Sequence, residues 1–243
     1  MESAQSSHSP ESRAADTNSY ARHDRILVAV DCIIFGFDGK KLRGLFIKRG
    51  FPPEEGNWSL MGGFVQNNES VDKAASRVLK QLTGLTNIYM EQLQCFGDVN
   101  RDAAGRVISI AYYSLINIED YNEQLQSGHE AHWFDLDEMP ELIFDHPLMV
   151  AKAKEQLQEK VATHPIGFEL LPEKFTLPQL QNLYEAIYNG PLDKRNFMRK
   201  ILSLGILNKL DEKEKTSSRK GAFYYIFDQE KYKRLAHDGM KFI

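Results

Sequence analysis

The sequence contains little cysteine. Its 243 residues include two cysteines, Cys32 and Cys95, and one pair cannot form the disulfide framework that staples small secreted domains. Cys32 lies within the apolar run VAVDCIIFGF, where a small thiol packs well in a core. We therefore expect both cysteines to be reduced core residues without redox chemistry.

Long apolar segments are also missing. No run approaches the ~20 apolar residues that cross a bilayer, and the polar N-terminus, MESAQSSHSPESRAADTNSYARHD, has no apolar core for a secretion signal. The sequence thus predicts a cytoplasmic protein without a membrane segment. Residues 1–24 are too polar to bury much surface, so we expect a disordered tail. The rest is long enough for two domains.

Charge is distributed unevenly along the chain. Residues 168–243 hold 14 Lys and Arg against 10 Asp and Glu, whereas residues 1–167 hold 16 against 24. A basic C-terminal part beside an acidic larger part favours a polyanionic partner for the smaller part. Ordinary variation in surface charge is the alternative.

The periodicity of apolar residues predicts one mixed sheet between helices, an α+β (α/β/α sandwich) domain over residues 25–162. Ser70 is the expected N-cap of its first helix, and Gly84 fits just beyond the C-terminus. We predict a linker over residues 163–172. The expected strands cover residues 26–36, 42–49, 88–99, 106–118 and 132–136, and the expected helices residues 70–82 and 147–161.

Residues 173–243 have the pattern of a winged helix-turn-helix domain. Two short helices, capped by Thr176 and Asp193, are separated by the breaker Asn189-Gly190-Pro191, and two strands joined by a charged loop follow. The second helix would read base edges in the major groove, and the hairpin would contact phosphates. A merely solvated charged face is the alternative. The candidate DNA-binding residues are Lys194, Arg195, Asn196, Arg199, Lys200, Arg219 and Lys220.

The spacing of Gly63, Glu69, Arg77 and Gly84 resembles the Nudix box, G-x5-E-x7-R-E-U-x-E-E-x-G-U, where U is aliphatic. In that family the three acids after the arginine bind divalent cations, which polarise a pyrophosphate. Hard cations need oxygen ligands, preferably carboxylates. We therefore predict no catalytic residues, no metal site and no cofactor. The three acids are replaced here by Val78, Gln81 and Leu82.

A degenerate Nudix domain followed by a winged helix resembles the Nudix-related transcriptional regulators. One branch of that family responds to ADP-ribose and governs NAD metabolism, and the other, from the Bacteroides group, responds to arabinose. Stretches such as WSLMGGFVQ, LIFDHP and FTLPQLQNLYEAIY resemble the arabinose branch. The resemblance implies a homodimeric repressor of sugar-utilisation genes that binds an operator in double-stranded DNA and responds to L-arabinose.

Sugars are held by planar polar groups and an aromatic face, and such groups lie on predicted strand ends and loops near the box. Each has a plain alternative as a core or surface residue. A residual hydrolase of nucleoside diphosphate derivatives, and a module that binds protein or RNA, are the other functional hypotheses. The candidate effector-binding residues are Lys48, Arg49, Trp58, Asp102, Tyr112 and Asp145.

Overall fold

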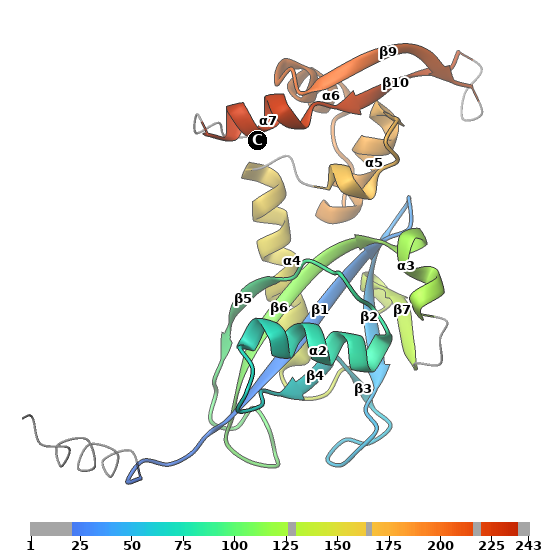
Figure 1. Cartoon of the computed structure of the whole chain (residues 1–243). Coiled ribbons are helices and arrows are strands. Elements are labelled where there is room, and N and C mark those ends of the chain that lie inside the picture. The colour runs from blue at the N-terminus through green and yellow to red at the C-terminus, as the bar shows by residue number, and fades with distance from the viewer. Residues whose placement is uncertain (1–20, 126–129, 164–166, 216–219, 238–243) are drawn as a thin grey trace, which may run out of the picture.

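The computed structural model describes residues 21–125, 130–163, 167–215 and 220–237. Most of the predicted disordered tail, residues 1–20, therefore lies outside the described residues. The chain forms a larger sheet-based part and a smaller C-terminal part, and α4 (His146–Thr163) runs from the first toward the second (Figure 1). No helix in these ranges is long and apolar enough to cross a membrane.

The larger part is built on a seven-stranded mixed sheet with the order β3-β2-β1-β6-β5, in which β4 also pairs with β1 and β7 with β2. Its two longest strands, β1 and β6, run parallel, with Leu27 opposite Val107 and Phe37 opposite Asn117. The strands are β1 (Leu27–Phe37), β2 (Leu42–Lys48), β3 (Trp58–Ser59), β4 (Met61–Phe64), β5 (Glu91–Phe96), β6 (Val107–Asn117) and β7 (Ala131–Asp135).

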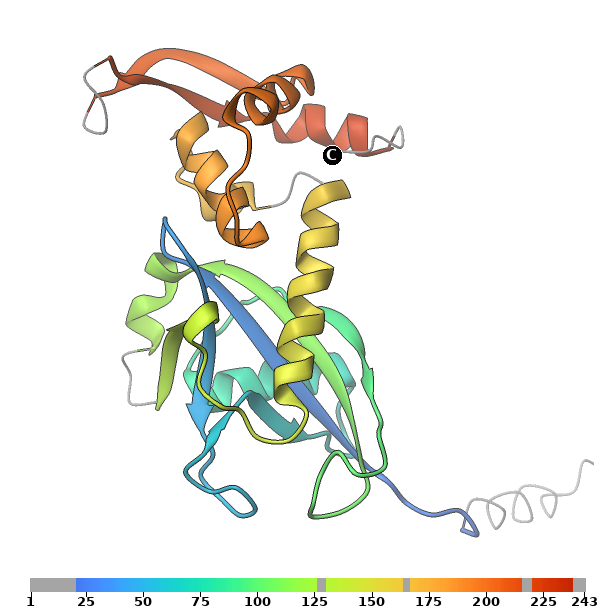
Figure 2. The same ribbon diagram turned by 180° about the vertical axis from the view of Figure 1, so that it is seen from behind.

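Strand β1 is buried on both faces, which explains its continuous apolar run. Because side chains alternate along a strand, Ile33 and Phe35 enter the core on the α4 side, whereas Cys32 and Ile34 enter the core beneath α2 (Val71–Thr83). The two helices cover opposite faces of the sheet (Figure 2). The predicted α/β/α sandwich is therefore confirmed.

Local signals place α2 as expected. The Ser70 side chain accepts a hydrogen bond from the Lys73 amide, and Gly84 adopts the left-handed conformation beyond the helix end. The predicted strand over residues 88–99 is shorter in the structure, spanning Glu91–Phe96. No predicted element corresponds to β3, β4 or the helix α3 (Ile118–Leu125), or to the short 3-10 helices η1 (Leu136–Glu138) and η2 (Phe168–Leu170).

The C-terminal part contains the predicted two helices and hairpin. Thr176 and Gln179 form a reciprocal capping box at the start of α5, and the Asp193 side chain caps α6. A three-stranded sheet with the order β8-β10-β9 follows. The elements are β8 (Phe175–Thr176), α5 (Leu177–Tyr188), α6 (Lys194–Ser203), β9 (Leu207–Glu214), β10 (Ala222–Phe227) and α7 (Gln229–His237).

The two parts share one hydrophobic cluster. It includes Leu157 and Val161 of α4 together with Phe168 and Leu183 of the C-terminal part. Polar contacts join the same surfaces, because the Gln158 side chain donates to the Ile187 carbonyl at 2.9 Å. The region predicted as a linker thus contributes buried apolar residues, Phe168 and Leu170 among them.

The shared cluster makes Leu157 a test of how the parts are held together. Leu157→Ala removes a side chain that is 1% exposed, and we expect it to lower the free energy of unfolding by about 2–5 kcal/mol. Leu148→Ala is the matched control on the same helix, since Leu148 is 52% exposed and should change stability by under about 0.5 kcal/mol. Denaturant unfolding of both variants is the measurement, and equal losses would contradict the packing described.

Candidate effector and DNA-binding sites

Arg77 is hydrogen-bonded to the side-chain oxygen atoms of Glu69 and Gln81, two positions of the Nudix box. Its guanidinium donates to both Glu69 carboxylate oxygens, at 2.9 and 2.6 Å, and to the Gln81 side-chain oxygen at 3.0 Å. It also donates to the Phe64 carbonyl at 3.0 Å. Hydrogen bonds from Arg77 hold the pKa of Glu69 down to about 2. The one acid retained from the box is therefore already paired with a cation of the chain itself.

Close packing fills the remaining face of the box. Val78 is buried against Gly63, where an added Cβ would lie 2.7 Å from Val78 Cγ2. Leu82 is partly buried and packs against the hydrophobic cluster that contains Val78. Within the described ranges, no group of three or more His, Cys, Asp or Glu side chains has the arrangement to hold a metal ion. In the folded box, Arg77 therefore bonds the preceding loop and the Glu69 carboxylate, and this carboxylate is not presented to a ligand.

A buried carboxylate, Asp31, lies at the centre of a neighbouring pocket. Asp31 is 5% exposed in the middle of β1. It accepts a hydrogen bond from Ser109 Oγ at 2.5 Å, and Arg101 Nη2 lies 3.6 Å from its Oδ2 atom. A side chain at Gly62 could not be accommodated, because its Cβ would lie 2.4 Å from Asp31 Oδ1. The backbone at residue 62 therefore passes directly against the Asp31 carboxylate, an approach that glycine permits.

Arg101 links Asp31 to the start of α4. Its guanidinium donates two hydrogen bonds to Asp145, at 2.9 and 2.7 Å, in the bidentate geometry typical of strong Arg–carboxylate pairs. The Arg101 side chain is 3% exposed. Removing one partner of such a buried pair leaves an uncompensated charge. The loop that carries Arg101 is therefore fixed against α4.

His146, the first residue of α4, completes the network. Its Nδ1 atom accepts from the Leu60 amide at 3.1 Å, so the neutral ring carries its proton on Nε2, which lies 3.7 Å from Asp31 Oδ1. Burial lowers the pKa of His146 below its ordinary value, although Asp31 and Asp145 oppose this shift. The imidazole is thus held neutral and oriented at physiological pH.

Aromatic rings and Arg49 form the rim of this pocket. The Arg49 guanidinium lies 4.0 Å from the Phe51 ring centroid and 5.5 Å from that of Phe144. Phe144 has a positive φ of 52°, a strained conformation that places its ring edge-on to His146. Asp102 also lines the cavity, whose volume is about 60 Å³. The site therefore offers a small polar cavity beneath an aromatic, cationic rim.

Three predicted effector-binding residues meet at this pocket. Arg49 and Asp102 line it, and Asp145 orients the lining residue Arg101. The other three lie elsewhere. Tyr112 points to the α2 face because it is in register with Cys32, and its hydroxyl donates to Asp72 at 2.6 Å.

Lys48 and Trp58 lie opposite each other where β2 pairs with β3, and neither lines the Asp31 pocket. The exposed Lys48 ammonium lies 5.4 Å from the Trp58 ring centroid. Trp58 packs edge-on against Phe134, with ring centroids 4.8 Å apart. The plain alternatives, a core tryptophan and a surface lysine, therefore describe these two residues.

Asp31, Arg101 and His146 were not among the predicted site residues. One signal was available for Asp31, since it is the only charge inside the apolar run of β1, and a buried charge needs partners. The sequence could not indicate which arginine and histidine supply them, because both lie far along the chain.

The residues of α6 that were predicted to contact DNA lie on the exposed surface of this helix. Lys194, Arg195, Asn196, Arg199 and Lys200 are all exposed, while Phe197 and Ile201 are buried on the other side of the helix. Arg199 donates to the Asn196 side-chain oxygen at 2.9 Å. The α6 face therefore presents cationic and amide groups suited to base edges and phosphates.

The β9–β10 hairpin adds further cations. Lys209 and Lys213 of β9 lie over the Phe223 ring, with ammonium-to-centroid distances of 3.6 and 4.3 Å. Lys220 is exposed next to β10, whereas Arg219 lies outside the described residues. The hairpin extends beyond α6 as a wing would (Figure 1).

Comparisons with known families match both parts of the chain. Residues 25–157 match the family model described as the NUDIX domain. Residues 167–227 match the model described as the NrtR DNA-binding winged helix domain. Together these two matches cover the described fold on either side of the junction at the end of α4.

Individual relatives span nearly the whole chain. The chain is 32% identical over 210 residues to the "ADPR responsive transcriptional repressor NtrR" of Acinetobacter baylyi, covering 85% of this chain and 84% of that protein. Shewanella oneidensis NrtR in complex with a 27mer DNA superposes with a TM-score of 0.72 at 28% identity, covering 85% of this chain and 95% of that one.

The isolated NUDIX domain of Shewanella oneidensis NrtR, solved with ADP ribose, has a TM-score of 0.52 at 28% identity, covering 62% of this chain and 99% of that one. The family matches and these likenesses agree with the fold. The chain belongs to the Nudix-related transcriptional regulators, which join a Nudix domain to an NrtR-type DNA-binding winged helix.

Proposed function

We propose that this protein is a transcriptional repressor whose affinity for operator DNA is set by an effector bound in the Asp31 pocket. Two features of the same chain carry the proposal. In the Nudix box, Arg77 is bonded to the retained acid Glu69, and in the winged helix, α6 exposes a basic face. The repressor and DNA-complex names of the relatives support it. Two copies would form a homodimer, because paired winged helices read two operator half-sites.

We propose ADP-ribose as the effector. Relatives that cover most of the chain, or most of its Nudix domain, are described as responsive to it or solved with it. The rim of the Asp31 pocket has suitable chemistry, because Phe51 and Phe64 are about half exposed and can stack on an adenine ring. Arg49, at the same rim, can pair with a phosphate.

L-arabinose is a second candidate, favoured by the charge and size of the pocket. Asp31 and Asp102 line it, and of its two lining arginines, Arg49 and Arg101, the second is already paired with Asp145. A diphosphate that arrives without a metal ion would add negative charge beside these carboxylates, whereas a neutral pentose would add none. The cavity of about 60 Å³ also suits a compact polyol better than a nucleotide sugar such as ADP-ribose. Neither of the two relatives described above is named for arabinose.

Hydrolysis forms no part of this proposal. A catalytic cation requires several hard oxygen ligands, and in this box Glu69 and Gln81 are bonded to Arg77. A substrate bound above it would meet no activated water. Binding without turnover is what a sensor of a metabolite needs.

DNA reading by α6 is tested by Arg195→Ala. If Arg195 pairs with a base, specific operator affinity should fall by about 1–3 kcal/mol while affinity for unrelated DNA changes little. Lys220→Ala gives the contrasting case, because loss of a phosphate contact should weaken all sequences and reduce the slope of log affinity against log salt by about 1. Lys80→Ala, an exposed charge on α2, is the control. Salt-dependent mobility shifts on the promoter beside the gene measure all three, and an unchanged operator affinity in Arg195→Ala would refute its role.

The effector is tested by calorimetric titration of the full chain with ADP-ribose and L-arabinose, in parallel with Asp102→Asn. The amide keeps the oxygen that caps the Ala104 amide and removes one negative charge. ADP-ribose should then bind more tightly by a few-fold, because repulsion of its diphosphate falls, whereas arabinose should bind about ten-fold more weakly for loss of a charged hydrogen bond. If neither compound binds and neither shifts operator affinity, the proposal fails.

The missing cation site is tested by restoring the acids. The triple variant Val78→Glu, Gln81→Glu, Leu82→Glu should raise Mn²⁺ affinity by about ten-fold or more, since it supplies carboxylates beside Glu69. The exposed single change Gln81→Glu provides a smaller gain without burying charge, in case the triple variant unfolds. Electron paramagnetic resonance of bound Mn²⁺ is the readout. A folded variant with unchanged affinity would show that these positions do not correspond to the family's acids.

A further inference from the structure

Two lysines of the β9–β10 hairpin converge on one aromatic ring. The Lys209 and Lys213 ammonium groups lie 3.6 and 4.3 Å from the Phe223 ring centroid, so both charges are close to one point. Both lysines are exposed, whereas Phe223 is partly buried and packs against the hydrophobic cluster shared by the two parts. Ammonium groups over the face of a ring are attracted by its quadrupole. Phe223 therefore holds two like charges close together at the molecular surface.

A β-bulge brings the second lysine to this ring. Phe223 is opposite Lys213, and an unbroken antiparallel ladder would then place Asp211 opposite Tyr225. The register instead shifts between Phe223 and Tyr225, and Lys209 takes the position opposite Tyr225. Bulges change which side chain a strand presents at a given point. In this hairpin the shift places a second cation where the regular ladder would place a carboxylate.

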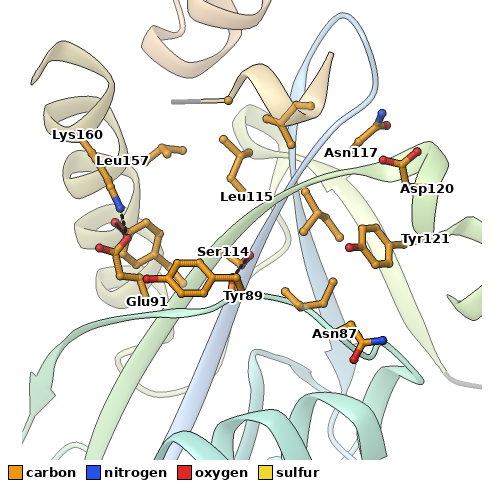
Figure 3. A pocket seen from close by; sticks show the side chains of 15 residues that line it. Asn87, Tyr89, Glu91, Ser114, Leu115, Asn117, Asp120, Tyr121, Leu157 and Lys160 are labelled. Atoms are coloured by element: carbon orange, nitrogen blue, oxygen red, sulfur yellow. Dashed lines mark hydrogen bonds and ion pairs between the residues drawn. The ribbon is translucent and has the colours of Figure 1, made fainter. Parts of the chain in front are cut away.

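Neither of the two lysines forms a salt bridge with another residue that the structure describes. Lysines elsewhere in the chain do have carboxylate partners. Lys160 of α4 is paired with Glu91 (Figure 3), and Lys174 is paired with Glu212 of β9. Because like charges repel each other, two ammonium groups over one ring attract an anion that can interact with both.

The backbone of the hairpin fixes the base of both lysines. Gly221 has a positive φ of 67°, and a Cβ added there would lie 3.4 Å from the Lys213 Cβ. Lys213 thus leaves β9 in contact with the returning backbone, while Lys209 belongs to the paired ladder beyond the bulge. Groups that are already oriented lose less conformational freedom when they bind a ligand.

We propose that Lys209 and Lys213, oriented by Phe223, form a clamp for one backbone phosphate of double-stranded DNA. The clamp rests on the proposed repressor function, to which it adds Phe223 as a positioning residue that acts through the two lysines. The hairpin extends beyond α6 (Figure 1), so a duplex that contacts α6 also passes the hairpin. Phosphate contacts of this kind fix the register of a protein on DNA.

The two lysines are tested by the salt dependence of DNA binding. Fluorescence anisotropy of the full-length protein is measured with two labelled duplexes, one from the promoter beside the gene and one of unrelated sequence. Loss of one phosphate contact lowers the slope of log affinity against log salt by about 0.9. The double variant Lys209→Gln, Lys213→Gln should show this change on both duplexes, whereas two independent contacts would give about 1.8. Lys80→Gln, an exposed lysine of α2, is the control with an unchanged slope.

Phe223 is tested by a matched pair of substitutions. Phe223→Leu keeps an apolar side chain but removes the ring face, and it should weaken binding of both duplexes by about five-fold. Phe223→Tyr keeps the ring face and should retain the affinity of the unchanged protein. When Phe223→Leu is combined with the double lysine variant, it should have no further effect on affinity. A purely structural role of the ring would weaken binding equally with and without the lysines.

Several results would overturn the clamp. It fails if the double lysine variant keeps the original slope, if its slope falls by about 1.8, or if Phe223→Leu weakens binding equally without the lysines. The exposed lysine changes decide the matter even where Phe223→Leu unfolds.

The same titrations separate the clamp from the repressor proposal. Preference for the promoter duplex with an unchanged slope in the double lysine variant supports the repressor and overturns the clamp. A slope lowered by about 0.9 on both duplexes, with no preference for the promoter, supports the clamp and counts against the repressor. Binding of neither duplex overturns both.

Discussion

A single carboxylate inside a strand buried on both faces is the constraint on which the candidate site depends. Asp31 cannot be solvated by bulk water, so the fold brings it a hydroxyl from β6, a guanidinium from a loop and an imidazole from α4. Those three contacts join segments far apart in the sequence. The backbone of Gly62 passes so close to this carboxylate that an added Cβ would lie 2.4 Å from Asp31 Oδ1. The contacts that satisfy the charge of Asp31 therefore have two consequences. They hold the start of α4 against β1, and they form the polar lining of the cavity.

In the Nudix box of this chain, the arginine of the motif ties the loop to the helix through hydrogen bonds. In a hydrolase, carboxylates on the helix need a divalent cation to relieve their repulsion. Here one carboxylate, one amide and one carbonyl are gathered by the Arg77 guanidinium, which offers five donors in a fixed fork. These hydrogen bonds hold the loop before α2 against the helix, and the buried Val78 packs beside them.

Much of the fold follows from local signals in the sequence. Cap residues at α2, α5 and α6, the breaker after α5 and the apolar run of β1 predict their elements, because each acts over a few residues. Elements such as β3 and α3 lack such signals and form through tertiary contacts. For the site, Arg49 and Asp102 were predictable as polar loop residues near the box. Tyr112 was not assignable, because the face to which a strand residue points depends on register with β1. Arg101 and His146 depend on contacts that only the folded chain defines.

The course of α4 has a mechanical consequence. Its first residue touches the Asp31 network and its last turns pack against α5, so one helix of 18 residues, about 27 Å at ~1.5 Å per residue, connects the Asp31 network with the winged helix. A pivot of about 5° at the His146 end would carry the far end through roughly 2 Å over that length. Displacements of this size are comparable with the spacing between successive base pairs, so a small tilt is enough to take α6 out of register with the groove.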